Sequence, residues 1–252
     1  MKYYVVADVH SYYTPLRYAL QQAGFFDETE PCRLVVCGDL FDRGREAVEL
    51  QDFLVQLLCE DRLILIRGNH EDLLLQLLEL LENGAVWDIA NGSSHHVKNG
   101  TWGTVVQLSG MEPAYALVRT EHLVKRMENT PFFKKLLPAM VNYFETEHYV
   151  FVHGWIPCHT NGSDWRQDGD DEWAEARWHN GIEMACRHHF TVPGKTVVCG
   201  HFHASFGHAR VSHKCSEFGE DADFTPFYGD GIIALDACTA YSGFVNCIVL
   251  ED

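Results

Sequence analysis

Short apolar segments recur along the chain and carry mainly β-branched or aromatic side chains. Segments of this length and composition are typical of buried strands. Five of them are residues 3–7, 34–37, 63–66, 149–152 and 196–199. Two further strands are expected near the end of the sequence, at residues 232–235 and 244–250, joined by a turn near Ser242 and Gly243.

Helical periodicity lies between these segments. Residues 15–23 and 45–60 show the pattern of helices, and residues 71–82 carry leucine on almost every side, which predicts a buried helix. A further helix is expected around residues 174–188. Because strands alternate with helices, the fold class is predicted to be α/β, with a sandwich of sheet and helices.

Residues 84–148 interrupt this alternation. They contain the stretch NGSSHHVKNGTWGT and the helical pattern TPFFKKLLPAM. We interpret them as a mostly helical, cap-like insertion over one edge of the sheet. The 252 residues are therefore expected to form a single domain with one insertion.

The charge of the chain restricts its partners. Asp and Glu outnumber Lys and Arg by 36 to 19, which gives a net charge of −17. Such a surface disfavours nucleic acids and anionic membranes, because both are bound through clustered Lys and Arg. No apolar run approaches the ~20 residues that cross a bilayer. Nine cysteines without a CxxC pair indicate reduced thiols, and we expect a cytoplasmic protein.

Each of the five apolar segments is followed by side chains that can bind metals or phosphate. In an α/β sheet, ligands bind beyond the carboxyl ends of the strands, so these side chains are expected to converge. Carboxylate, imidazole and carboxamide together suit manganese, iron or zinc, and a shared carboxylate would make a dinuclear centre. The residues are Asp8, His10, Asp39, Asp42, Arg43, Asn69, His70, His153, His201 and His203.

The ordered motifs D-x-H, GDxxDRG, RGNHE, VHG and GHxH resemble those of the calcineurin-like metallophosphoesterase superfamily. GDLFDRG and IRGNHE look most like the phosphoprotein phosphatase branch, which includes bacterial and phage serine/threonine phosphatases and diadenosine tetraphosphatases. The resemblance implies a β-sandwich flanked by helices. Two departures, Ser11 after D-x-H and Gly154-Trp155 after the fourth histidine, remove no ligand but bear on the substrate.

The resemblance also implies roles for individual residues. Asp8, His10 and Asp39 would hold the first metal. Asp39 would bridge to a second metal, completed by Asn69, His153 and His201. His203 is expected to join the first metal, since residues two apart on an extended segment point the same way; hydrogen bonding to a carboxylate or to the substrate is the alternative.

The same resemblance implies that His70 is the general acid and that Asp42 orients it. Arg43 would hold the phosphoryl oxygens. Arg67 and Arg177 are further candidates for substrate binding, with Arg166 as second choice for the arginine that follows His153. The tryptophans at positions 165, 173 and 178 are assigned to core packing in preference to a substrate platform.

The expected activity is hydrolysis of phosphomonoesters, first of all phosphoserine or phosphothreonine in proteins, by attack of a hydroxide bound to two metals. The expected cofactors are two divalent ions, manganese first and iron or zinc as alternatives. The expected partner is a phosphorylated protein or a small phosphoester. Two other functions stay open: hydrolysis of a dinucleoside polyphosphate or other nucleotide, and a non-catalytic metal-binding interaction module. The intact His70, Asp42 and Arg43 argue against the module.

Overall fold

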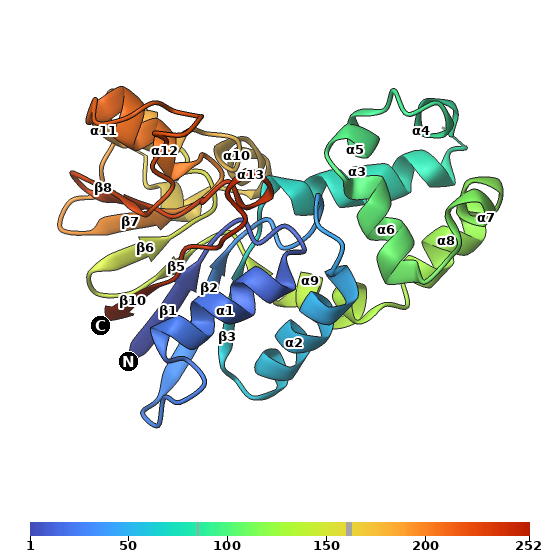
Figure 1. Cartoon of the computed structure of the whole chain (residues 1–252), viewed down its shortest axis with the longest axis horizontal. Helices are drawn as coiled ribbons and strands as arrows, with labels where there is room; N and C mark the ends of the chain where they lie inside the picture. Colours follow the sequence, from blue (N-terminus) through green and yellow to red (C-terminus); the bar gives the residue numbers. More distant parts are fainter. Residues whose placement is uncertain (85, 160–162) are drawn as a thin grey trace.

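The computed structural model describes residues 1–84, 86–159 and 163–252, and these residues form two sheets with helices around them (Figure 1). The first sheet has the order β10-β1-β2-β3-β4. Strands β1 to β4 are parallel, and β10 pairs with β1 in the antiparallel sense. The five strands are β1 (Lys2–Val6), β2 (Cys32–Cys37), β3 (Leu63–Ile66), β4 (Met140–Val141) and β10 (Ile248–Glu251).

The second sheet has the order β5-β6-β7-β9-β8. Its central strands β6, β7 and β9 are parallel, whereas the two edge strands are antiparallel to their neighbours. The strands are β5 (Phe144–Glu145), β6 (Tyr149–Phe151), β7 (Thr196–Cys199), β8 (Phe227–Gly229) and β9 (Ile232–Ala234).

The two sheets pack face to face through alternate residues of their strands. Val5 and Val35 of the first sheet share one buried cluster with Phe151 and Val198 of the second. Their neighbours along the strands, such as Val6, belong instead to the cluster that the helices cover. Because successive side chains of a strand point to opposite faces, each continuous apolar run is buried on both faces. The predicted α/β sandwich is confirmed.

Helices α1 (Tyr13–Ala23) and α2 (Ala47–Cys59) cover the outer face of the first sheet, where Leu20 and Leu54 are fully buried (Figure 1). Helix α3 (Asn69–Glu82) starts two residues before the predicted helix. It begins directly after the β3 loop, so its first turn carries Asn69 and His70 into the site.

The insertion is mostly helical, as expected. Figure 1 shows the helices of residues 87–127 gathered beside the sandwich; two of them, α6 (Thr101–Ser109) and α8 (Thr120–Met127), contact α3. Residue 85 of the interval 84–148 lies outside the described residues, and the division into domains stays a prediction. Strands β4 and β5 also fall within this interval, so its last part belongs to the two sheets. The helical elements are α4 (Trp87–Ala90), α5 (His95–Lys98), α6 (Thr101–Ser109), α7 (Pro113–Val118), α8 (Thr120–Met127), a π-helix (Phe132–Leu136) and α9 (Leu137–Ala139).

Two predicted elements differ from the structure. The single helix expected at 174–188 is two helices, α10 (Asp170–Ala176) and α11 (Gly181–Cys186), because Asn180 caps the second one by accepting hydrogen bonds from Ile182 N and Glu183 N. The strand expected at 244–250 is shorter, and the turn before it is the end of helix α13 (Thr239–Ser242), closed by Gly243 at φ 79°.

The remaining short elements are a 3₁₀-helix (Trp165–Gln167), α12 (Ala204–Phe206) and a π-helix (Gly207–Val211). No helix among the described residues is both long and apolar enough to cross a membrane.

Candidate active site

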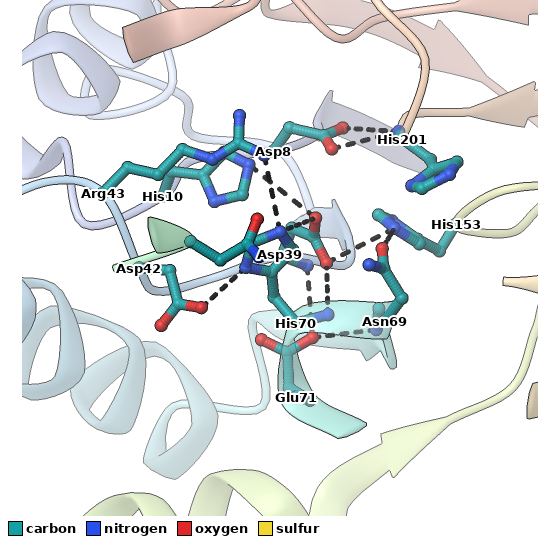
Figure 2. A network of polar contacts seen from close by, with 12 residues as sticks. Asp8, His10, Asp39, Asp42, Arg43, Asn69, His70, Glu71, His153 and His201 are labelled. Atoms are coloured by element: carbon teal, nitrogen blue, oxygen red, sulfur yellow. Dashed lines mark hydrogen bonds and ion pairs between the residues drawn. The ribbon is translucent and has the colours of Figure 1, made fainter. Parts of the chain in front are cut away.

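The loops that follow β1, β2 and β3 of one sheet meet the loops that follow β6 and β7 of the other. Figure 2 shows predicted side chains from these loops gathered around Asp39, among them Asp8, His10, Asn69, His70, His153 and His201. Two groups of potential metal ligands result, each with its donor atoms within 4.8 Å of one another. Both groups contain Asp39; the first adds His10 and His70, and the second adds His153 and His201.

Asp39 lies between the two groups, with one carboxylate oxygen facing each. Its Oδ2 is 3.7 Å from His10 Nε2 and 3.8 Å from His70 Nε2. Its Oδ1 is 3.3 Å from His153 Nε2 and accepts a hydrogen bond from the backbone N–H of His70. Burial would raise the pKa of Asp39, but the imidazoles of His153, His70 and His10 hold it below its ordinary value. The arrangement is that of a carboxylate that can bridge two cations.

Backbone carbonyls fix the orientation of two of the imidazoles. His10 Nδ1 lies 2.8 Å from Phe41 O, and His153 Nδ1 lies 2.8 Å from Cys37 O. A ring that donates through Nδ1 keeps a free lone pair on Nε2, and Nε2 is the atom that faces Asp39 in both residues. Burial lowers the pKa of His10 to about 3, so this ring is neutral and able to bind a metal at neutral pH.

Asn69 lies beside the second group: its Oδ1 is 2.8 Å from His153 Nε2. His201 completes this group, and burial together with His153 lowers its pKa to about 4. A neutral imidazole, a carboxamide oxygen and an ionised carboxylate form a donor set that suits manganese, iron or zinc. The described residues therefore fit two divalent ions, without distinguishing between these metals.

Asp8 belongs to neither of the two groups. Both of its carboxylate oxygens accept the backbone N–H of His201, at 3.0 and 2.9 Å. Burial, with the charges of Asp236 and Asp39, raises the pKa of Asp8 well above its ordinary value. Gly200 is required at this point, because a Cβ there would overlap Asp8 Oδ2. The role of Asp8 as a ligand of the first metal stays a prediction.

His70 and Asp42 form a buried pair with a separation of 2.6 Å between Nδ1 and Oδ2. Burial would lower the pKa of His70, but Asp39 and Asp42 raise it. This is the arrangement of a general acid that is oriented by a carboxylate. It is equally the arrangement of a metal-bound histidine, because such a histidine often donates its other ring N–H to a carboxylate. Arg43 is exposed, and its Nη2 lies 3.5 Å from His70 Nε2.

Several of these residues have a strained backbone. Non-glycine residues seldom adopt positive φ, and such conformations collect at functional sites. Here the loops after β1, β2 and β7 bend sharply enough to turn side chains of opposite sheets toward one another. The predicted site residues with positive φ are Asp8, His10, Asp39, Asp42, Arg43 and His201, at 51° to 76°.

Three other predicted site residues, His203, Arg67 and Arg177, are paired with carboxylates of the protein. His203 Nε2 is 3.1 Å from Glu217 Oε1, which is the hydrogen-bonded alternative, and its role as a metal ligand stays a prediction. Arg67 and Arg177 both pair with Asp72, at 2.6 and 2.7 Å. Both guanidinium groups are therefore engaged by a carboxylate, and their binding of substrate also stays a prediction.

The remaining candidates are Arg166 and the tryptophans at positions 165, 173 and 178. Arg166 pairs with Glu145 and Asp164. Trp165 and Trp173 are buried, as expected. Trp178 is 50% exposed, and its ring lies edge-on to that of His201 with the centroids 5.8 Å apart, so core packing was the wrong interpretation for this residue.

Sequence reasoning missed two buried carboxylates. Glu71 accepts the backbone N–H groups of Gly68, Asp39 and Leu40, and so joins the loops after β2 and β3. Asp236 follows β9 and lies in the same charge cluster as Asp8. Asp236 follows the segment 232–235, so the strand-end rule extended to that segment would have found it. Glu71 could have been found as the acidic third residue of a capping box.

The two sheets and the shared carboxylate define the metallophosphoesterase class. Residues 1–205 match the calcineurin-like phosphoesterase family, and the chain belongs to that family. The chain is therefore a phosphoester hydrolase of the kind that depends on two metal ions.

One curated relative has a stated substrate. The chain is 24% identical to the bis(5'-nucleosyl)-tetraphosphatase PrpE (asymmetrical) of Bacillus velezensis over 139 residues, which are 53% of this chain and 51% of the relative. The chain thus matches about half the length of that relative.

Two solved structures share the fold. A cold-active protein-tyrosine phosphatase of a psychrophilic Shewanella species superposes with a TM-score of 0.61 at 16% identity, covering 100% of this chain and 75% of that chain. A candidate diadenosine tetraphosphatase superposes with a TM-score of 0.53 at 15% identity, covering 99% and 89%.

Proposed function

We propose that the chain hydrolyses phosphomonoesters, with phosphoserine and phosphothreonine of proteins as the first substrate class. The observation that carries the proposal is the position of Asp39, whose two carboxylate oxygens face the two groups of histidines. Asp8, His10 and Asp39, with His203, would hold one ion, and Asp39, Asn69, His153 and His201 the other. Two such ions supply Lewis-acid polarisation of the phosphoryl group and activation of water.

The residues around the metal ligands have distinct tasks. Arg43 is exposed beside the site and, within the described parts of the chain, forms no ion pair with Asp or Glu, so its guanidinium is available to a phosphoryl group. His70 presents Nε2 toward the site while Nδ1 is held by Asp42. A proton on His70 Nε2 can pass to the oxygen of the departing alcohol, which would otherwise leave as an alkoxide.

A second candidate is a dinucleoside polyphosphate. The similarity to the Bacillus velezensis enzyme favours it, and so does Trp178, whose half-exposed ring beside His201 offers a face on which a nucleobase could stack. A protein substrate has no need of such a platform, so a substitution of Trp178 separates the two candidates.

A substrate panel tests both candidates. The purified enzyme, loaded with manganese, is assayed on p-nitrophenyl phosphate, phosphopeptides, diadenosine tetraphosphate and bis-p-nitrophenyl phosphate. The proposal expects the highest kcat/KM on phosphopeptides and an unchanged value for Trp178→Ala. A preference for diadenosine tetraphosphate that Trp178→Ala abolishes would establish the second candidate. Absence of metal-dependent hydrolysis of every compound would refute both and favour the non-catalytic module.

A further inference from the structure

We infer that Thr101 and Thr104, two residues of the helical insertion, are positioning residues for the general acid His70. They act through Asp42, and the inference rests on the proposed role of His70. Helix α6 begins at Thr101, and both threonines are fully buried against the loop after β2. Nothing in the motifs of the strand ends assigns a task to them.

Both hydroxyl groups donate to the carboxylate of Asp42. Thr101 Oγ1 lies 2.7 Å from Asp42 Oδ2, the same oxygen that receives His70 Nδ1 at 2.6 Å. Thr104 Oγ1 lies 2.8 Å from Asp42 Oδ1 and also accepts the backbone N–H of Asp42 at 2.9 Å. The carboxylate is therefore held at both oxygens, and its plane is fixed relative to the imidazole.

These hydroxyls matter because Asp42 is almost completely buried, with 1% of its surface exposed. No lysine or arginine pairs with it within residues 1–84, 86–159 and 163–252; among the ion pairs formed there, its partner is His70. A buried carboxylate without a cation is costly unless donors satisfy its oxygens. Thr101 and Thr104 supply these donors, and they leave Asp42 Oδ2 directed at His70 Nδ1.

The helix that carries the threonines is itself fixed to the same loop. Gln107 donates to Gly44 O and accepts Ala47 N–H, so α6 contacts the loop through a second point. A Cβ at Gly100 would overlap the backbone nitrogen of Arg43, which shows how closely the start of α6 approaches. The insertion thus supplies two residues that position the pair of Asp42 and His70, in addition to packing against α3.

The test uses the isosteric variants Thr101→Val and Thr104→Val, with Thr101→Ser and Thr104→Ser as matched controls that keep the hydroxyl. Manganese-loaded enzymes are assayed on p-nitrophenyl phosphate, whose leaving group departs without a proton, and on phenyl phosphate and a phosphoserine peptide, whose leaving groups need one. Metal content is measured on the same samples. His70→Asn is included as the reference for complete loss of the acid.

The valine variants should lose about 10-fold or more in kcat on the phosphoserine peptide, a part of the ~10²–10⁴-fold that a general acid supplies, and much less on p-nitrophenyl phosphate. Thr101→Val should show the larger defect, since Thr101 shares Oδ2 with His70. The serine variants should stay near wild-type activity, and all variants should retain both metals.

Equal losses on all three substrates, or serine variants as impaired as the valine variants, would mean that the threonines only support the fold. Wild-type activity in both valine variants would also overturn the inference while the proposed function stands. If one valine variant does not fold, the other carries the test, because each threonine holds its own oxygen of Asp42; equal losses on all three substrates in that variant overturn the inference. A wild-type enzyme without phosphoesterase activity would instead refute the proposed function.

Discussion

Glu71→Gln should flatten the pH dependence of the stability of the metal-free protein. Burial, together with the charge of Asp39, raises the pKa of Glu71 from 4.5 to about 7. The group keeps its proton in the folded protein at a pH where the unfolded chain has already lost it. Its contribution to stability is therefore fully present below pH 4.5 and is lost as the pH rises through about 7.

The size of the effect follows from the two pKa values. At about 1.4 kcal/mol per pH unit, ionising Glu71 in the folded metal-free protein costs roughly 3 kcal/mol more than in the unfolded chain. Between about pH 5 and pH 8 the free energy of unfolding of the wild type should therefore fall by roughly 2–3 kcal/mol more than that of Glu71→Gln. Glu71→Gln also loses hydrogen bonds to the backbone. It loses them at both pH values, so this loss does not change the difference between the two proteins in how far the free energy of unfolding falls.

The measurement is urea unfolding in EDTA, followed by tryptophan fluorescence at several pH values. Glu79→Gln, a substitution on the exposed side of the same helix, is the matched control. Its free energy of unfolding should change with pH in the same way as that of the wild type. Parallel curves for Glu71→Gln and the wild type would refute the reasoning. Added manganese should reduce the difference, since cations beside Asp39 favour the ionised carboxylate.

Four further outcomes are expected. His70→Asn should lower kcat on poor leaving groups by ~10²–10⁴-fold with unchanged metal content by mass spectrometry; loss of metal would make His70 a ligand. The wild type should bind two ions per chain and Asp39→Asn fewer, with activity lost; one ion in the wild type and an active variant would contradict the bridging role. In a metal-loaded crystal a ring nitrogen of His203 should lie ~2.0–2.3 Å from the ion held by Asp8 and His10; a distance beyond ~3.5 Å would exclude it. Duplex DNA should not shift in gels at physiological salt, and tight, salt-sensitive binding would count against the charge argument.

The sequence by itself determined most strands of the sandwich and the place of the site, but not the short strands β4, β5 and β8. A four-residue apolar run such as 63–66 must be buried on both faces, and Arg67, Gly68 and Asn69 after it must then lie at the carboxyl edge of the sheet. This local reasoning brought Asp39, His153 and other strand-end side chains together where the carboxyl ends of the two sheets meet, and their binding of metals stays a prediction. It failed for the helix at 174–188, where a single cap residue, Asn180, divides a continuous pattern.

Only the tertiary structure decided which side chains meet. Thr101 and Asp42 are 59 residues apart, and Arg67 and Arg177 come to the same Asp72 from different loops. Periodicity reports which face of a segment is buried, but it carries no information on the partner that a buried polar group finds. The pairing depends on how the insertion packs on the sheets. For that reason the convergence of the side chains at the strand ends could be predicted from sequence, whereas the hydroxyl groups that hold Asp42 could not.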